Sequence, residues 1–306
     1  MKRFHRGSLL VLILTILAAC SRSESPTVFQ LKLQPGATYR TQITTEQTVE
    51  QAQQGGTQQT TTIHQMILSY SIREVAADGT IQVDSIHEQV TITQENPGGT
   101  AVRYDSANPS ANQNAEAYAA IYAPIIGQPI AMQFAPNGEV TNITGLEAII
   151  EASLGKSPAG PQREQLRQMM TDNVKQSLIN DSGNLVFPNQ PIQVGASWPQ
   201  KNTLSNSLFT MAMDTTYTLT ERKDGIATIA VKAIGTLLPG QPARMMGMEK
   251  KLTMQGDETG TVSINEATGW PIRTQIQQTF AGTLVLGEPS HSMHMTMPMT
   301  LSLIHI

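Results

Sequence analysis

Residues 64–79 read HQMILSYSIREVAADG, and this stretch decides the fold class because its polar and apolar side chains alternate. The alternating set is His64, Met66, Leu68, Tyr70 and Ile72. In an extended strand these residues lie on one face of a sheet and the residues between them lie on the other face. The stretch ends in Asp78-Gly79, a pair that tolerates the positive φ of a short hairpin loop. The sequence therefore predicts a strand with one buried face and an antiparallel partner.

The same alternation recurs on both sides of this stretch. Further sets of shared parity are Tyr39, Thr41, Ile43, Thr45 and Val49; Met213, Thr215, Tyr217 and Leu219; and Ile272, Ile276 and Phe280. Turn pairs also stand at Asn137-Gly138, Asp224-Gly225 and Thr268-Gly269. Between Ile81 and Ile92 the apolar parity changes from odd to even, with Ile86 as the first even member, which predicts a β-bulge or a strand that bends between two packing surfaces. Most of the chain is thus expected to form antiparallel strands.

The middle of the chain changes to a helical period. Leu146, Ile149, Ile150 and Leu154 fit one face of a short helix closed by Gly155. A second helix is expected after Pro161, and a weaker one from about residue 112 to residue 122. The expected apolar face of the second helix is Leu166, Met169, Met170, Val174, Leu178 and Ile179. These helices are expected to pack on the sheets or cap them.

Two β-rich regions flank the helices and share landmarks in the same order. Residues 35–39, PGATY, resemble residues 194–198, VGASW. Each of these turns is followed by a strand entering a tight turn, and then by a hairpin at residues 134–138 or 265–269. The order favours an internal duplication. We expect an N-terminal β half at 29–145, a helical segment at 146–185 and a C-terminal β half at 186–306, arranged as a pseudo-duplicated half-barrel or sandwich.

The N-terminus has the features of a bacterial lipoprotein signal. Lys2, Arg3 and Arg6 precede an apolar core that is about half the length of a membrane-spanning helix. The run LAAC at 17–20 reads as a lipobox, so residues 1–19 are expected to be a cleaved signal peptide. Cys20 would carry the acyl chains, including palmitate, that give stable membrane anchoring, and residues 20–28 would form a tether. Ser21 favours the outer membrane, facing the periplasm, if the host is Gram-negative.

Charge and cysteine content exclude several classes of function. Without residues 1–19 the chain has 17 Lys plus Arg against 24 Asp plus Glu, a net charge near −7. A mildly acidic chain with few aromatic residues gives little support to nucleic-acid binding. Cys20 is the only cysteine, so the mature domain is expected to have no disulfide, no thiolate nucleophile and no cysteine-bound metal. No cofactor is expected.

The segment at 291–299, HSMHMTMPM, could carry either packing or chemistry. On a strand, one face would present Met293, Met295, Met297, Met299, Leu301 and Leu303, which predicts a Met-rich core or the wall of a ligand cavity. Thioethers and imidazoles also suit Cu(I), so His291, Met293, His294 and Met295 are candidate copper ligands. His294 would point to the opposite face from the methionines, which disfavours a copper site.

Other catalytic patterns are missing from the sequence. It contains no serine nucleophile elbow, no phosphate-binding glycine loop and no His-Glu-x-x-His motif. Asp84, His87 and Glu88 lie close together, but a solvated strand face explains the two carboxylates. His64 is expected to be partly buried and satisfied by the backbone rather than to act as a base. The chain is therefore expected not to be an enzyme.

The chain also resembles a family of bacterial surface lipoproteins whose shared domain has no assigned function. The resemblance rests on the lipobox, the Gly-x-x-Tyr/Trp turns, the segment ending in residues 127–129, GQP, and the hairpin reaching Gly145. It implies a lipid-anchored β-rich domain and brings no catalytic residues. A looser similarity, at the level of fold, is to periplasmic carriers of lipids and lipoproteins, which place helices across the mouth of a curved sheet.

Three functions remain open from the sequence. The first is binding of an apolar ligand in a cavity lined by the Met, Leu and Ile stripes. The second is an interaction scaffold for another envelope protein or a cell-wall polymer. The third is copper handling by the C-terminal Met/His tract. A cavity beside Met299, Leu301 and Leu303 would favour the first, and a filled core would favour the second.

Overall fold

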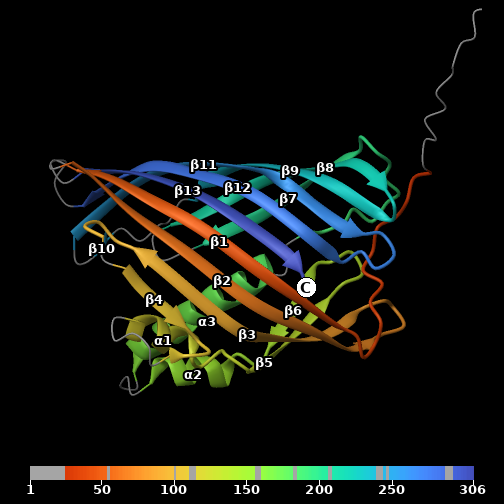
Figure 1. Ribbon diagram of the computed structural model, residues 1–306, viewed down its shortest axis with the longest axis horizontal. Helices are drawn as coiled ribbons and strands as arrows, with labels where there is room; N and C mark the ends of the chain where they lie inside the picture. Colours follow the sequence, from red (N-terminus) through yellow and green to blue (C-terminus); the bar gives the residue numbers. More distant parts are fainter. Residues whose placement is uncertain are drawn as a thin grey trace, which may run out of the picture.

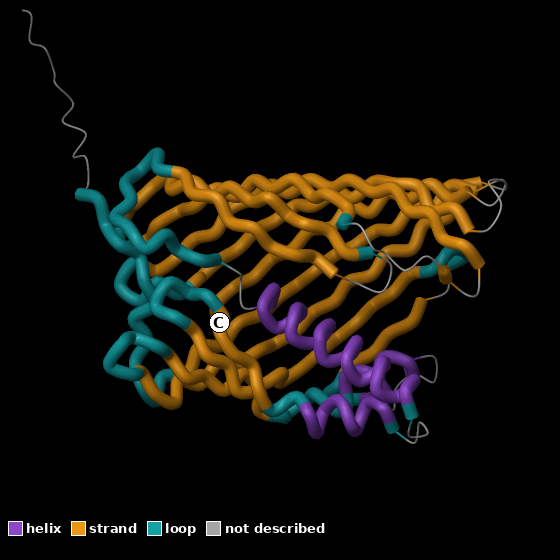
Figure 2. Tube along the Cα trace, turned by 180° about the vertical axis from the view of Figure 1, so that it is seen from behind, coloured by secondary structure: helices purple, strands orange, loops and turns teal. Residues whose placement is uncertain are grey.

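The computed structural model describes residues 25–53, 56–99, 101–109, 115–155, 160–181, 185–205, 209–238, 244–245, 248–286 and 292–306. The predicted signal peptide, Cys20, Ser21 and His291 lie outside these residues. The strands form one long, curved antiparallel sheet, and the helices lie together against one side of it (Figures 1 and 2). The fold is thus mainly β, as predicted, and it matches the half-barrel alternative rather than a sandwich.

The strands fall into two blocks along the chain, and two helices separate these blocks. The first block contains β1 (Thr38–Gln53), β2 (Gly56–Val75), β3 (Ile81–Glu95), β4 (Ala101–Asp105), α1 (Glu116–Tyr122), β5 (Pro129–Phe134) and β6 (Val140–Thr144). Two helices follow, α2 (Glu147–Leu154) and α3 (Pro161–Asp181). The second block contains β7 (Ser197–Ser205), β8 (Thr210–Lys223), β9 (Ile226–Leu237), β10 (Arg244–Met245), β11 (Met248–Asn265), β12 (Pro271–Leu286) and β13 (Ser292–His305).

The strand order repeats the same arrangement twice. The sheet runs β6-β5-β3-β2-β1-β13-β12-β11-β9-β8-β7. On one side of β13 the sequence of pairings is β6-β5-β3-β2-β1, and on the other side it is β12-β11-β9-β8-β7. β13 joins the two sets by pairing with β1 and with β12. The landmarks that predicted a duplication therefore occupy equivalent places in two five-strand sets.

Matching hydrogen bonds surround the two aromatic turns. The Gly36 amide donates to the Ile72 carbonyl at 2.8 Å, and the Gly195 amide donates to the Leu219 carbonyl at 2.7 Å. Both glycines have positive φ, +82° and +92°, which explains why glycine stands there. The register also shifts at one corresponding place in each set, after Ile72 and after Leu219.

The predicted bulge is present in β3, but it lies at Glu88, two residues after Ile86, where the change of parity placed it. Gln89 pairs with Ile67 and His87 pairs with Leu68, so Glu88 is the extra residue. Ser85 and His87 are buried with Ile81 and Val83, and the buried face resumes at Val90. Ile86 therefore remains on the outer face, contrary to the prediction, because the strand changes phase only at Glu88.

The helices cover part of the concave face. Ile149, Ile150 and Leu154 of α2 are buried in the core of the first block, and Gly155 ends the helix as predicted. On α3 only Leu178 is fully buried, while Met170, Val174 and Ile179 pack partly against the core. Leu166 and Met169 are exposed, so the packed face of α3 is narrower than predicted. Among the described residues, no helix has the length and apolar character needed to cross a membrane.

A strap of residues 25–33 runs across one end of the sheet. Thr27 bridges to Ile192, the Leu31 amide donates to the Pro136 carbonyl, and the Lys32 amide donates to the Thr268 carbonyl. Arg222 pairs with Glu266 at 2.7 Å, donates to the Ser25 carbonyl at 3.1 Å and stacks over Phe29. The strap thus contacts the turns of the β5–β6 and β11–β12 hairpins, one from each block.

Candidate functional site

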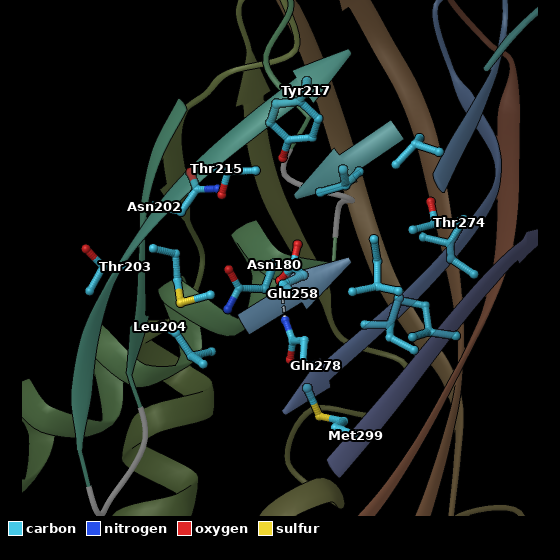
Figure 3. Close-up of a pocket in the computed structure, with 17 residues that line it drawn as sticks. Asn180, Asn202, Thr203, Leu204, Thr215, Tyr217, Glu258, Thr274, Gln278 and Met299 are labelled. Atoms are coloured by element: carbon cyan, nitrogen blue, oxygen red, sulfur yellow. Dashed lines mark hydrogen bonds between the residues drawn. The ribbon is translucent and has the colours of Figure 1, made fainter. Parts of the chain in front are cut away.

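A cavity of about 190 Å³ lies on the concave face of the second block (Figure 3). Its wall is formed by the inward faces of β1, β7, β8, β9, β11, β12 and β13, and Asn180 near the end of α3 contributes from the opposite side. The apolar lining consists of Ile43, Leu204, Met213, Val231, Val262, Ile276, Met299, Leu301 and Leu303. The polar lining consists of Asn180, Asn202, Thr203, Thr215, Tyr217, Glu258, Thr274 and Gln278.

The structure divides the predicted methionine stripe of β13 into two parts. Met299, Leu301 and Leu303 line the cavity. Met295 and Met297 are buried in a filled core with Met211, Met254 and Phe280, and Met293 packs partly against that core. The six residues share a face, as the parity implied, but only the last three border open space. A cavity wall and a filled core thus occupy different lengths of one strand.

Two polar side chains face each other on the floor of the cavity. Glu258 on β11 and Gln278 on β12 are direct cross-strand neighbours. Gln278 Nε2 donates a hydrogen bond to Glu258 Oε2 at 2.5 Å, and Gln278 Oε1 is buried without a hydrogen-bond partner among the described residues. The pair projects from two adjacent strands into the cavity (Figure 3).

Thr274 and Tyr217 are two further polar side chains that line the cavity. Thr274 is only 4% exposed, and its Oγ1 is also buried without a described partner. Tyr217 lies on β8 and forms a side-chain hydrogen bond with Asn202 of β7. Thr274 lies on β12 four residues before Gln278, about 13 Å along the strand, so the two unpartnered oxygens line different parts of the cavity. The cavity therefore combines apolar surface with several polar side chains, as small-molecule sites do.

Burial controls the protonation of the two acids in this region. Burial raises the pKa of Glu258, and the hydrogen bond from Gln278 opposes that rise. Burial and the nearby Glu258 charge both raise the pKa of Tyr217, so the phenol remains protonated at neutral pH. A carboxyl group held in an apolar wall is costly to ionise unless a donor or a positive charge faces it.

The sequence analysis did not identify Glu258, Gln278, Thr274 or Tyr217 as site residues. A usable signal was present on β11, where Glu258 has the same parity as Met254, Val262 and Ile264, which are all buried. A carboxylate on an apolar strand face is unusual. The signal was masked because Glu258 lies within the polar run 257–259, DET.

The candidate copper residues do not converge. Met293 and Met295 point to the inner face of β13, whereas His294 is exposed on the outer face, where its Nδ1 lies 2.9 Å from Thr283 Oγ1. His291 is outside the described residues. Within the described part of the chain, no group of three or more His, Cys, Asp or Glu side chains is arranged to hold a metal ion.

A second buried polar group lies under α1. His64 on β2 contacts the Tyr122 ring with 5.5 Å between centroids, and Gly127 donates to the His87 carbonyl at 2.9 Å. His64 Nε2, His87 Nδ1 and Ser85 Oγ are buried without described partners. The expectation that the backbone satisfies His64 therefore fails at Nε2. On the outer face, Asp84 pairs with Arg73 and Glu88 pairs with Arg40, as expected for a solvated surface.

The fold and the cavity define a class: antiparallel β proteins built from one curved sheet, with helices beside a cavity on its concave face. Within that class, the chain belongs to DUF6263, a family of unknown function whose model matches residues 78–271. A search of curated proteins finds no match. Among solved structures, an outer membrane channel from Pseudomonas putida F1 is similar at 8% identity and a TM-score of 0.22, covering 90% of this chain and 97% of that chain. A TM-score this low carries no functional argument.

Proposed function

We propose that this protein is a lipid-anchored envelope protein without catalytic activity that binds an apolar ligand in the cavity of the second block. The observation that carries the proposal is the wall formed by Met299, Leu301 and Leu303, which faces open space although the same face of β13 is filled at Met295 and Met297. Open apolar surface inside a protein is costly unless a ligand covers it, because the lining atoms lose their packing contacts.

The size of the cavity limits the ligand. Cavities for drug-sized ligands usually measure about 300–1,000 Å³, and this one measures about 190 Å³. The ligand inferred from this volume is a small apolar molecule or one alkyl chain rather than a multi-chain lipid. The interaction scaffold remains the alternative function, and it would leave the cavity without a ligand.

A pair of variants on β13 tests the proposal. Leu301 borders the cavity, and Thr300 is exposed on the outer face of the same strand. We expect Leu301→Trp to fill the space and weaken binding of a fluorescent apolar probe by at least about 10-fold, which corresponds to about 1.4 kcal/mol. Thr300→Trp adds the same side chain outside and should leave probe binding at the wild-type level.

The variants are compared after circular dichroism has shown that both are folded. Equal probe affinity in both variants would contradict the proposal, because the probe would then bind elsewhere. Native mass spectrometry on the chain from Ser21 onward, purified from the periplasm, supplies an independent readout. A retained mass of small-lipid size supports the ligand-binding function, and an empty protein favours the interaction scaffold.

The proposed membrane location rests on the sequence of residues 1–23 and on the strap. The carbonyl of Ser25, the first described residue, accepts a hydrogen bond from Arg222 at the end of the sheet that the strap crosses. A lipid on Cys20 would therefore place this end nearest the membrane. In a Gram-negative host the proposed location is the outer membrane, facing the periplasm.

A further inference from the structure

Two polar atoms that line the cavity are buried without a described hydrogen-bond partner. Gln278 uses its Nε2 donor in the hydrogen bond to Glu258, so the side-chain atom without a described partner is the acceptor Oε1. The assignment of the amide follows from chemistry, because two oxygens facing each other could not form this hydrogen bond while Glu258 is ionised. Thr274 Oγ1 is the second atom without a described partner.

Acceptors dominate this part of the cavity, and positive charge is lacking there. The Glu258 carboxylate and Gln278 Oε1 accept hydrogen bonds, whereas Thr274 lies about 13 Å away along β12 and contacts another part of the cavity. None of the described lining residues is Lys, Arg or His. A ligand group that satisfies these atoms must donate several hydrogen bonds, and a positive charge on it would be attracted by Glu258.

We propose that the ligand is a single-chain amphiphile with a protonated amine as its head group, held by Glu258 and Gln278 while its chain covers the Met299–Leu303 wall. This inference rests on the proposed apolar-ligand function and adds the class of the ligand. An ammonium group has three donors and no acceptor, which suits the carboxylate oxygens of Glu258 and the Oε1 atom of Gln278.

Two further observations support an ammonium group over other head groups. Burial raises the pKa of Glu258, and a cation beside the carboxylate would offset the cost of keeping it ionised. A carboxylate or phosphate head group would be repelled by Glu258 and would leave the acceptor atoms unpaired. A neutral hydroxyl can donate only one hydrogen bond to the cluster.

Three probes of equal chain length separate these possibilities: dodecylamine, 1-dodecanol and dodecanoate, each used at about pH 7 below its micelle concentration or, for the alcohol, below its solubility limit. The protein is the chain from Ser21 onward, which contains every described residue, and each probe competes with the same fluorescent apolar reporter. We expect dodecylamine to bind at least about 10-fold more tightly than dodecanoate, with dodecanol between them.

The outcomes distinguish the two proposals. If dodecanol or dodecanoate binds as tightly as dodecylamine, the amine inference is overturned while the apolar-ligand function stands. If neither the reporter nor any of the three probes binds, the apolar-ligand function itself fails.

Neighbouring carboxylates on β11 provide a matched pair of variants. Glu258→Gln removes the charge inside the cavity, and Asp257→Asn removes the same charge from the exposed outer face. The ratio of dodecylamine to dodecanoate affinity should fall at least about 5-fold in Glu258→Gln and stay at the wild-type value in Asp257→Asn.

An equal fall in Glu258→Gln and Asp257→Asn would overturn the inference, because the preference would then reflect the net negative charge of the whole chain. An unchanged ratio in Glu258→Gln would overturn it as well. Circular dichroism and thermal unfolding of each variant show that the comparison is made between folded proteins.

Discussion

His64 and His87 are titratable side chains buried far from the cavity residues, under α1. Burial lowers the pKa of His64 to about 4, and burial together with the nearby His64 lowers the pKa of His87 to about 4. In the unfolded chain both would titrate near pH 6.5. Between these values the unfolded chain binds more protons than the folded one, so acid favours unfolding in this interval.

We therefore expect the free energy of unfolding to be fully retained above about pH 6.5 and to fall as the pH is lowered towards about 4, by up to about 3 kcal/mol per histidine. Urea unfolding at a series of pH values measures this dependence. The double variant His64→Gln, His87→Gln should flatten it across this window. His294→Gln, on the exposed face of β13, should keep the wild-type dependence, and a double variant with the wild-type slope would refute the assignment.

Sequence reasoning succeeded best where a single residue has a local physical role. Gly79, Gly138, Gly225 and Gly269 all have positive φ, and each lies in a turn predicted from its dipeptide. It was weaker for Met295 and Met299, because parity assigns both to one face but does not show whether the space opposite is filled. Glu258 was missed because it lies within a polar run, although it shares the parity of the buried Met254, Val262 and Ile264. The register of β11 against β9 and β12 confirms that it faces inward.

At the level of elements, the strap depends on close approach to a hairpin turn. Gly269 has φ +70°, and a Cβ atom there would lie 2.2 Å from the Gln30 carbonyl oxygen of the strap. Gly98 also has positive φ, +86°, but a Cβ atom there would meet nothing within 4 Å. Substitution by alanine would therefore strain the backbone at both glycines, but only at Gly269 would the new Cβ atom collide with the strap.

We expect Gly98→Ala to lower the free energy of unfolding by about 1–2 kcal/mol, the cost of a left-handed non-glycine residue. Gly269→Ala should cost at least about 1 kcal/mol more, because it also displaces the strap and its hydrogen bond from Lys32 to Thr268. Chemical unfolding of both variants provides the comparison. Equal losses would show that the strap adapts to the added methyl group.

Hydrophobic periodicity predicted which elements form and in what order better than it predicted which face of a strand each residue occupies. The helix ending at Gly155 and the helix starting at Pro161 were both expected from their apolar spacing and their terminal residues. Ile86 was assigned to the wrong face because nothing local distinguishes it from Val90. The buried face of β3 changes parity at the bulge residue Glu88. The Glu88 carboxylate pairs there with Arg40 of β1 at 2.6 Å, a contact between residues that are distant in sequence.

For the whole molecule, the proposed lipid anchor gives a prediction about location. Cys20→Ser removes the thiol that would carry the acyl chains, so the variant should leave the acylated membrane fraction and lose metabolic labelling with a palmitate analogue. Cell fractionation followed by immunoblotting measures the shift. Ser21→Ala is the control, because it keeps the thiol, and labelling that persists in Cys20→Ser would contradict the anchor.

The position of β13 has a consequence for how the chain reaches its final form. Thr41 pairs with His305 and Ala52 pairs with His294, so strands roughly 250 residues apart in sequence lie side by side. Before β13 arrives, β1 and β12 each present an unpaired edge, and such edges invite self-association. The two five-strand sets can form from contacts closer in sequence, whereas their union waits for one late strand that pairs on both sides. A newly made chain therefore passes through a stage in which it is vulnerable to aggregation, and insertion of β13 ends that stage.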